Sequence, residues 1–176
     1  MSKKTSTLLA QVSAVPKDEP FVQITFELMN SPSWRAKSIS CSKLLDFLML
    51  EHMAHKGMEN GNLLATYNQL EQFGIARNCI NKTIQEAENL GLVIAERKGR
   101  QARNKNYCTC FKLTFLPHSF HNEKGVKMYS EPSNDWRMIT DAEIEKLKNK
   151  KVKRLNFNSD CRNLHSTGVK STTNKV

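Results

Sequence analysis

The sequence predicts a mainly α-helical fold with one small β-hairpin, and three observations support this prediction. Apolar residues recur at helical spacing in two long segments of the chain. Between these segments, Thr66 and Gln69 have the spacing of a capping box, which marks the start of a short helix. Two strand-like segments, 92–95 and 107–116, then flank a basic stretch that contains glycine. This order of elements predicts a winged helix-turn-helix domain over residues 20–117.

The N-terminal part of the chain is expected to be irregular before it becomes helical. Residues 1–19 are polar and aperiodic, which predicts a disordered segment. Alternating apolar and polar residues at 21–25 predict a short edge strand, and residues 26–30 are expected to form a helical turn. The Pro-containing run 31–33 is expected to end this helical turn. Trp34 follows it, and we expect this ring to plug the core beneath the first long helix rather than to stack on a base.

The first long helix is predicted over residues 40–56. Ser38 or Ser40 is its expected N-cap, and Gly57 is expected to end it. Six apolar side chains nearly encircle the helix, namely Leu44, Leu45, Phe47, Leu48, Leu50 and Met53. A helix that is apolar on nearly every side is expected to be buried at the centre of the domain.

A short helix, a turn and a longer helix follow. The short helix is predicted over residues 67–73, with Leu70 and Phe73 buried. Gly74 supplies the left-handed conformation that the turn needs. The longer helix is predicted over residues 76–90, and its inner face carries Ile80, Ile84, Ala87 and Leu90 at helical spacing.

Beyond the hairpin, the chain is expected to leave the compact domain. Residues 118–139 lack periodicity and predict an irregular linker. Thr140 and Glu143 form a second capping box, so a helix with a basic end is predicted over residues 140–154. Residues 155–176 are polar and rich in Asn, Ser and Thr, which predicts a disordered tail. The helix and the tail together form a basic C-terminal extension.

The net charge of +10 is confined to two parts of the chain. When Lys and Arg are counted against Asp and Glu, residues 1–75 are neutral and residues 128–136 carry −2. Residues 76–127 and residues 137–176 each carry +6. A basic excess restricted to one helix, its hairpin and the tail is typical of a protein that binds a polyanion.

Cysteine usage and hydropathy indicate where the protein resides. The five cysteines form an odd count without a regular framework, which fits free thiols in a reducing compartment. No window approaches the roughly 18 uninterrupted apolar residues of a membrane span. The first apolar run is too short for a secretory signal. The chain is therefore expected to be cytoplasmic and nucleoid-associated, without membrane contact.

Five polar side chains of the longer helix are not needed for its core-facing side. They are Arg77, Asn78, Asn81, Lys82 and Gln85. Their spacing places them on one outer face near the helix N-terminus, the end that usually enters the major groove of DNA. Arg and Lys can bond guanine O6 and N7, and Asn and Gln can form paired bonds with adenine N6 and N7. These residues are the predicted base readers, and an ordinary solvated helix face is the alternative.

The basic hairpin is predicted to be a wing that binds phosphates. Its cations are Arg97, Lys98, Arg100, Arg103 and Lys105, with no acidic residue among them. Five phosphate contacts would give a slope of about −4 to −5 in log K against log salt concentration. Thr66 and Tyr67, at the start of the short helix, are further candidates for phosphate contact. The basic run 146–154 is a second candidate, for phosphate or for a protein partner.

Motifs for catalysis and for metal binding are weak in this chain. Cys108, Cys110, His118 and His121 have a metal-like composition, but neither pair has the Cys-x2-Cys spacing typical of structural zinc sites. The sequence has no phosphate-binding glycine loop, no dinucleotide fingerprint and no His-Glu-x-x-His motif. It therefore predicts no enzyme, no metal site and no cofactor.

Nine short segments carry a resemblance to a known family. They are 21–25, 31–36, 43–48, 51–52, 60–64, 67–70, 74–75, 87–92 and 133–137. Over about residues 20–137 the chain resembles small winged helix-turn-helix proteins of alphaproteobacterial genomes, plasmids and prophages. That group is loosely compared with plasmid replication initiators and transcription regulators, so the resemblance implies DNA binding. Leu70 stands where a small residue is usual, which favours the looser winged variant of the motif.

The function predicted from the sequence is sequence-specific binding of double-stranded DNA, as a transcription regulator of a bacterial or mobile-element gene. A plasmid or phage replication initiator that binds origin repeats is the first alternative. A non-catalytic protein-interaction module of the same fold is the second. Two-fold DNA sites would favour a homodimer. The basic C-terminal extension is the candidate contact for a replication or transcription partner.

Overall fold

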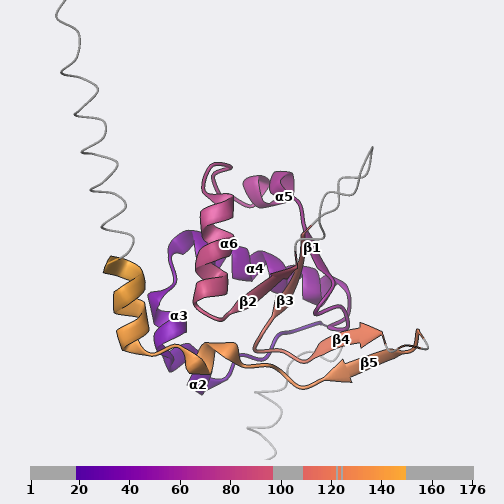
Figure 1. Cartoon of the computed structure of the whole chain (residues 1–176). Helices are drawn as coiled ribbons and strands as arrows, with labels where there is room; N and C mark the ends of the chain where they lie inside the picture. Colours follow the sequence, from indigo (N-terminus) through magenta and orange to yellow (C-terminus); the bar gives the residue numbers. More distant parts are fainter. Residues whose placement is uncertain (1–18, 97–108, 122, 124, 150–176) are drawn as a thin grey trace, which may run out of the picture.

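The chain folds into helices and two small antiparallel sheets (Figure 1). A computed structural model describes residues 19–96, 109–121, 123 and 125–149. In chain order its elements are α2 (Phe26–Asn30), α3 (Pro32–Ala36), α4 (Ile39–Ala54), β1 (Leu63–Ala65), α5 (Tyr67–Gln72), α6 (Ile80–Asn89), β2 (Val93–Glu96), β3 (Thr109–Leu113), β4 (His118–His121), β5 (Lys127–Ser130) and the 3-10 helix η1 (Asp135–Met138). A further helix begins at residue 141 and continues to residue 149, the last one described. The fold is therefore mixed, with more strand than the mainly helical prediction implied.

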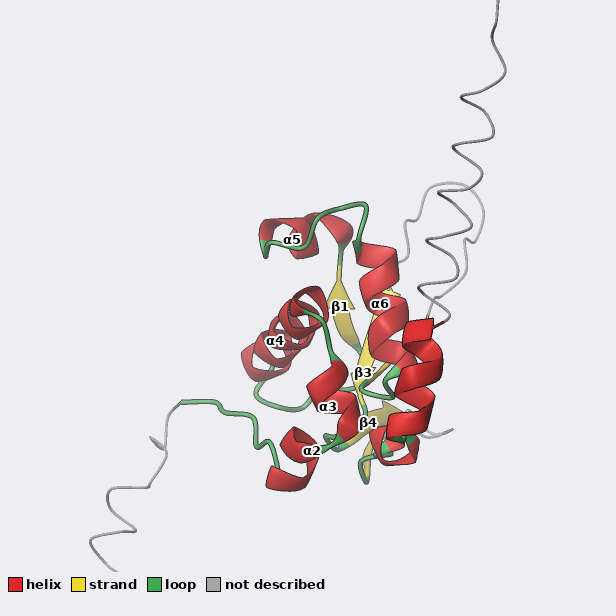
Figure 2. Cartoon of the chain, turned by 90° about the vertical axis from the view of Figure 1, so that its left-hand side faces the viewer, coloured by secondary structure: helices red, strands yellow, loops and turns green. Residues whose placement is uncertain are grey.

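The larger sheet has three strands in the order β1-β3-β2, and each neighbouring pair is antiparallel. Phe111 of β3 lies opposite Leu63 of β1 on one side and Ala95 of β2 on the other. α4 contacts β1 and α6, and α6 contacts β2, so the helices and the sheet share one core. Figure 2 shows α5 above α4 and α6, at one end of the molecule.

α4 buries only one of its faces. Ser38 is its N-cap, and the Ser38 hydroxyl accepts a hydrogen bond from the N–H of Cys41 at 3.2 Å. The buried side chains, which recur every three or four residues, are Cys41, Leu44, Leu45, Leu48 and His52. Leu50 is half exposed, and Phe47 and Met53 are only partly buried. The prediction of a helix buried on nearly every side is therefore wrong, because the fully buried residues lie on one face and Phe47 and Met49 are only partly covered.

The short helix α5 and the turn after it follow the prediction closely, although α5 ends at Gln72 and Phe73 is only partly buried. Thr66 and Gln69 exchange the two reciprocal bonds of a capping box. Gly74 has a φ of +91°, the left-handed conformation in which glycine is strongly preferred. Ile75 is buried directly after the turn.

The longer helix starts later than predicted. α6 begins at Ile80, and residues 77–79 form a turn before it. Cys79 stands at the N-cap position but provides no side-chain capping bond. The turn is closed by the N–H of Cys79, which donates to the carbonyl of Ala76 at 2.8 Å. The buried face of α6 is the predicted one, with Ile84 and its helical neighbours inside the core.

The segment before α4 differs from the prediction in two ways. Residues 21–25 form no strand, although two of their apolar side chains pack against the core. The predicted helical turn is α2, which ends at Asn30 as the Pro-containing run requires, but the same run also starts α3, because the Ser31 hydroxyl accepts from the N–H of Trp34 at 3.2 Å. The Trp34 ring packs against the core and meets Phe115 edge-on, with ring centroids 6.0 Å apart.

The prediction of an irregular linker at 118–139 is wrong. β4 and β5 form an antiparallel hairpin in which Phe120 lies opposite Met128. η1 follows the hairpin and buries Trp136 in the same core as the helices. The hydroxyl of Ser33 in α3 donates to the carbonyl of Trp136 at 3.1 Å. The shared core thus extends well beyond residue 117.

A buried asparagine, Asn60, ties the hairpin to the larger sheet. Its Nδ2 donates to the carbonyls of Leu113, Leu116 and Pro117 at 2.8, 3.0 and 3.1 Å. Its Oδ1 accepts from the N–H of Leu113 at 2.7 Å, and its backbone carbonyl accepts from the N–H of Ser119 at 2.8 Å. One side chain therefore satisfies four backbone bonds where β3 ends and β4 approaches.

The last described elements pack closely on the end of α6. A Cβ on Gly91 would lie only 2.8 Å from the backbone of Asp135 and Trp136, so η1 requires glycine here. The second capping box is present, since the N–H of Thr140 donates to Glu143 at 3.0 Å. Residues 1–18, the end of the predicted basic helix and the predicted tail lie outside the described residues. Within the described residues, no helix has both the length and the apolar character needed to cross a membrane.

Candidate nucleic-acid interface

Several elements meet at the end of the molecule that is uppermost in Figures 1 and 2. α5 starts directly after β1, and Ala65 at the end of β1 lies opposite Thr109. β2 ends at Glu96, which lies opposite Cys110. The described residues that flank segment 97–108 therefore lie beside the start of α5.

The α5–α6 end, defined as residues 66–85, carries all five predicted base readers as exposed side chains. They are Arg77, Asn78, Asn81, Lys82 and Gln85. The last three lie on α6, on the side away from its buried face. The first two lie in the turn before α6, so the prediction that all five share one helix is wrong. They still lie within three residues of the first residue of α6.

Arg77 is bound to α5. Its Nη1 donates to Oδ1 of Asn68 at 2.8 Å and to Oε2 of Glu71 at 3.0 Å. The Arg77 and Glu71 side chains are 57% and 48% exposed, and exposed ion pairs of this kind contribute at most about 1 kcal/mol. An incoming phosphate or base edge can therefore displace Glu71. Sequence spacing gave no signal for this contact, which crosses the turn.

Asn81 is also bound to α5. The hydroxyl of Tyr67 donates to its Oδ1. By contrast, the side chains of Asn78, Lys82 and Gln85 form no hydrogen bond or ion pair with another described residue. Two predicted readers are thus held in place by the neighbouring helix, and three are free to meet a ligand.

The two predicted phosphate contacts at the start of α5 are already engaged within the protein. The Thr66 hydroxyl accepts from the N–H of Gln69 at 3.2 Å and donates to Oε1 of Gln69 at 2.7 Å. The Tyr67 hydroxyl is bound to Asn81. Thr66 therefore shapes the start of α5, and its hydroxyl would have to give up internal bonds to reach a phosphate.

The predicted wing lies outside the described residues. Its five cations are Arg97, Lys98, Arg100, Arg103 and Lys105. The described strands on either side, β2 and β3, are antiparallel neighbours. Phosphate binding by the wing accordingly stays a prediction from the sequence.

The turn of the α5–α6 end is supported from below by α4. The Nζ of Lys43 donates to the carbonyl of Gly74 at 2.9 Å. The Phe47 ring meets the Phe73 ring edge-on, with centroids 5.5 Å apart, which is a favourable aromatic geometry. These contacts fix the position of the turn relative to α4. Lys43 is a further cation of this surface that the sequence pattern did not single out.

The partly buried carboxylate of Glu86 connects α6 to the start of α4. Glu86 accepts from the N–H of Ser38 at 2.8 Å and from the Ser38 hydroxyl at 2.9 Å. Nearby, burial raises the pKa of the Cys41 thiol to about 12, and the Glu86 charge adds to this shift. Cys41 is therefore a packing residue with an unreactive thiol, as its place in the core suggests.

The histidines and cysteines do not assemble a metal site among the described residues. No group of three or more His, Cys, Asp or Glu side chains in that part of the chain could hold an ion. Burial lowers the pKa of His52, and burial followed by the charge of Lys112 lowers the pKa of His118. Both rings are therefore neutral at pH 7. Cys108 and the side chain of His121 lie outside the described residues.

Comparison with known proteins identifies no relative of this chain. The resemblance to alphaproteobacterial winged helix-turn-helix proteins therefore stays a prediction from the sequence. No protein-family model, no curated protein and no solved structure matches the chain.

Proposed function

We propose that the chain binds double-stranded DNA sequence-specifically through a winged helix-turn-helix domain and regulates transcription. The order α4, β1, α5, α6, β2, β3 supports the proposal, because it supplies a helix-turn-helix followed by two strands that can form a wing. The observation that carries it is the exposed polar face of the α5–α6 end. The start of α5 in this end follows Ala65, which lies opposite Thr109, the first described residue after the basic segment 97–108.

The dimensions of α6 suit the major groove. The helix has ten residues and is therefore about 15 Å long, while the groove is about 12 Å wide. The predicted readers lie at its N-terminal end, which is the end that contacts base edges in helix-turn-helix proteins. Amide and cationic side chains are the types that form paired bonds with adenine and guanine.

The charges of the α5–α6 end imply a division of roles. Residues 66–85 contain two cations, Arg77 and Lys82, and one carboxylate, Glu71. So small an excess supplies little affinity for a polyanion. The five cations of segment 97–108 would provide most of the phosphate contacts, and such contacts position the protein without reading sequence.

The reading role is tested by selection from random duplexes. We expect the wild-type protein to enrich a common sequence. Replacing Arg77, Asn81 and Gln85 together with Ala should abolish that enrichment and leave salt-sensitive, non-specific binding in place. The matched control replaces Arg35, Asn30 and Gln23, which are exposed residues of the same three types outside the α5–α6 end. An unchanged selected sequence in the first variant would show that α6 is not the reader.

The wing is tested by its effect on salt dependence. Each Ala replacement among the five cations of segment 97–108 should reduce the slope of log K against log salt by about 0.9. The affinity should fall similarly for all duplexes, because phosphates carry no sequence information. A slope that stays constant would place the phosphate contacts elsewhere. Mapping the occupied sites in cells would then separate promoters from replication origins.

A further inference from the structure

The hydrogen bond between Tyr67 and Asn81 joins the start of α5 to the exposed face of α6. The Tyr67 ring is partly buried and packs against the core. The capping box formed by Thr66 and Gln69 fixes the backbone at the same point. The hydroxyl therefore reaches Asn81 from a well-held position, whereas the Asn81 side chain is itself exposed.

This bond determines which part of the Asn81 amide is available to a ligand. An asparagine amide has an oxygen that accepts and an NH2 group that donates, on opposite sides of one carbon. Oδ1 of Asn81 is directed at Tyr67, so Nδ2 is directed away from it. Nδ2 forms no hydrogen bond with another described residue. Oδ1 keeps its second lone pair, but it is tethered to Tyr67, so the group of Asn81 that has no bond inside the protein is a donor.

The base edges in the major groove respond differently to a lone donor. Guanine presents two acceptors, N7 and O6, and thymine presents the acceptor O4. Adenine also presents the acceptor N7, but its N6 donor lies beside it, so a lone donor gains one bond there and paired reading of adenine needs both the oxygen and the NH2 group of an amide. An amide whose oxygen is tethered to Tyr67 can form that pair only in the orientation that the tether allows, which weakens paired reading.

We propose that Tyr67 sets the base preference of Asn81, because it holds Oδ1 and leaves Nδ2 as a donor that favours guanine or thymine over adenine. The inference rests on the proposed DNA-binding function and deepens it. It revises the expectation from sequence for both residues. Tyr67 becomes a positioning residue rather than a phosphate contact, and Asn81 becomes a reader of acceptors rather than of adenine.

The experiment compares Tyr67→Phe with the wild-type protein. This change removes the hydroxyl and keeps the ring that packs against the core. Tyr129→Phe is the matched control, because Tyr129 is an exposed residue of β5 outside the α5–α6 end. Preferred duplexes are selected with each protein, and affinities are then measured with each of the four bases at every position. Asn81→Ala identifies the position that Asn81 reads, as the one at which preference disappears.

At that position the wild-type protein is expected to prefer guanine or thymine. Tyr67→Phe is expected to raise the affinity for duplexes with adenine there, relative to those with guanine or thymine, by about tenfold. That factor is the size of one hydrogen bond to a base edge. Its salt slope and its thermal midpoint should match those of Tyr129→Phe, which a general loss of structure would not allow.

Three results would overturn the inference and leave the proposed function intact. One is an identical base preference in the wild-type and Tyr67→Phe proteins. Another is an adenine preference of the wild-type protein at the Asn81 position, which decides the matter even if Tyr67→Phe fails to fold. The third is an Asn81→Ala protein with the wild-type profile at all positions. A wild-type protein that selects no sequence would overturn the proposed function together with the inference.

Discussion

The two ends of the molecule hold their polar side chains in different ways. At the α5–α6 end, exposed side chains bond one another, as Arg77 does with Glu71. The opposite end comprises β4, β5, η1 and the residues bound to them, and is called here the hairpin end. It too has exposed pairs, but buried side chains also bond the backbone there, as Asn60 and Ser33 do. Exposed pairs exchange readily for a ligand, whereas a buried bond to the backbone is costly to lose. We therefore expect the proposed DNA binding and the larger share of the stability to depend on different ends.

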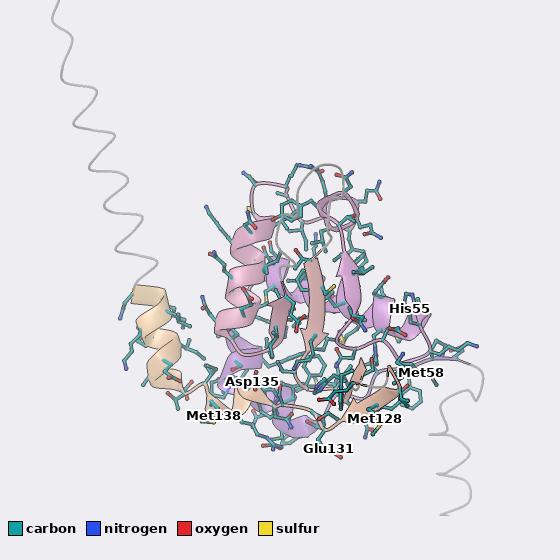
Figure 3. The ribbon with its side chains drawn as sticks, turned by 45° about the vertical axis from the view of Figure 1, so that its right-hand side comes forward. His55, Met58, Met128, Glu131, Asp135 and Met138 are labelled. Carbon is teal, nitrogen blue, oxygen red and sulfur yellow. The ribbon has the colours of Figure 1, made fainter. Side chains whose placement is uncertain are left out.

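The surfaces of the two ends differ as well. Figure 3 shows Met58 and Met128 on one side of the hairpin end and Met138 on the other, with Glu131 and Asp135 along the same end. The three methionines are 52%, 45% and 77% exposed. The cations Lys127 and Arg137 of β5 and η1 are paired with Glu59 and Glu27, so this end offers little free positive charge to a polyanion. This difference agrees with the proposal that DNA approaches the α5–α6 end.

The largest expected effect is a loss of stability at the hairpin end. Asn60→Ala removes the partner of four backbone hydrogen bonds around Leu113 and Pro117. We expect the free energy of unfolding to fall by about 4 kcal/mol, since each buried group left unsatisfied costs about 1–3 kcal/mol. Urea denaturation followed by tryptophan fluorescence measures it. Asn78→Ala at the other end should change stability by less than about 0.5 kcal/mol. Similar losses in the two variants would remove the distinction between the ends.

A smaller loss is expected where η1 meets α6. Gly91→Ala places a methyl group 2.8 Å from the backbone of Trp136 at a φ of +64°, so we expect a loss of about 3 kcal/mol. Gly125→Ala is the control, because Gly125 has a φ of +73° but no atom within 4 Å of the added group. The free energy of unfolding of Gly125→Ala should fall by only about 1 kcal/mol, which is the cost of the backbone conformation. Equal thermal shifts in the two variants would mean that η1 does not pack on Gly91 in solution.

The smallest effect separates the ends through binding rather than stability. Glu71→Gln removes the carboxylate that holds Arg77 and should raise DNA affinity about threefold at low salt, because a phosphate no longer competes with it. Glu27→Gln breaks an equivalent exposed pair, with Arg137 at 2.7 Å, at the hairpin end. It should leave DNA affinity unchanged. Fluorescence anisotropy with a labelled duplex checks both, and an equal response would argue against specific competition at Arg77.

Local signals in the sequence were sufficient for those parts of the fold that depend on near neighbours. The capping boxes at Thr66 and Thr140 involve residues three apart, and both occur as predicted. Gly74 takes the left-handed conformation that the turn required. Helical periodicity also identified the buried side of α6, and with it the three exposed polar side chains opposite, Asn81, Lys82 and Gln85. These features need no knowledge of the rest of the chain.

The missed features depend on contacts between distant residues. The alternation at 21–25 suits a strand, but no described strand pairs with it. Segment 118–139 looked irregular, yet β4 pairs with β5, and Ser119 bonds Asn60, which lies 59 residues earlier. The attachment of Asn81 to Tyr67 likewise depends on how the turn folds α6 back on α5. Neither composition nor spacing carries such information.

The hydrogen bond from Ser33 to Trp136 has a consequence for the timing of synthesis. Its partners are 103 residues apart. A ribosome adds about 5–20 residues each second, so α3 is made about 5–20 s before its carbonyl partner exists. The nascent chain therefore completes the helices of the α5–α6 end while its first helices still wait for η1. During synthesis, the end proposed to read DNA is therefore made before η1, which completes the shared core.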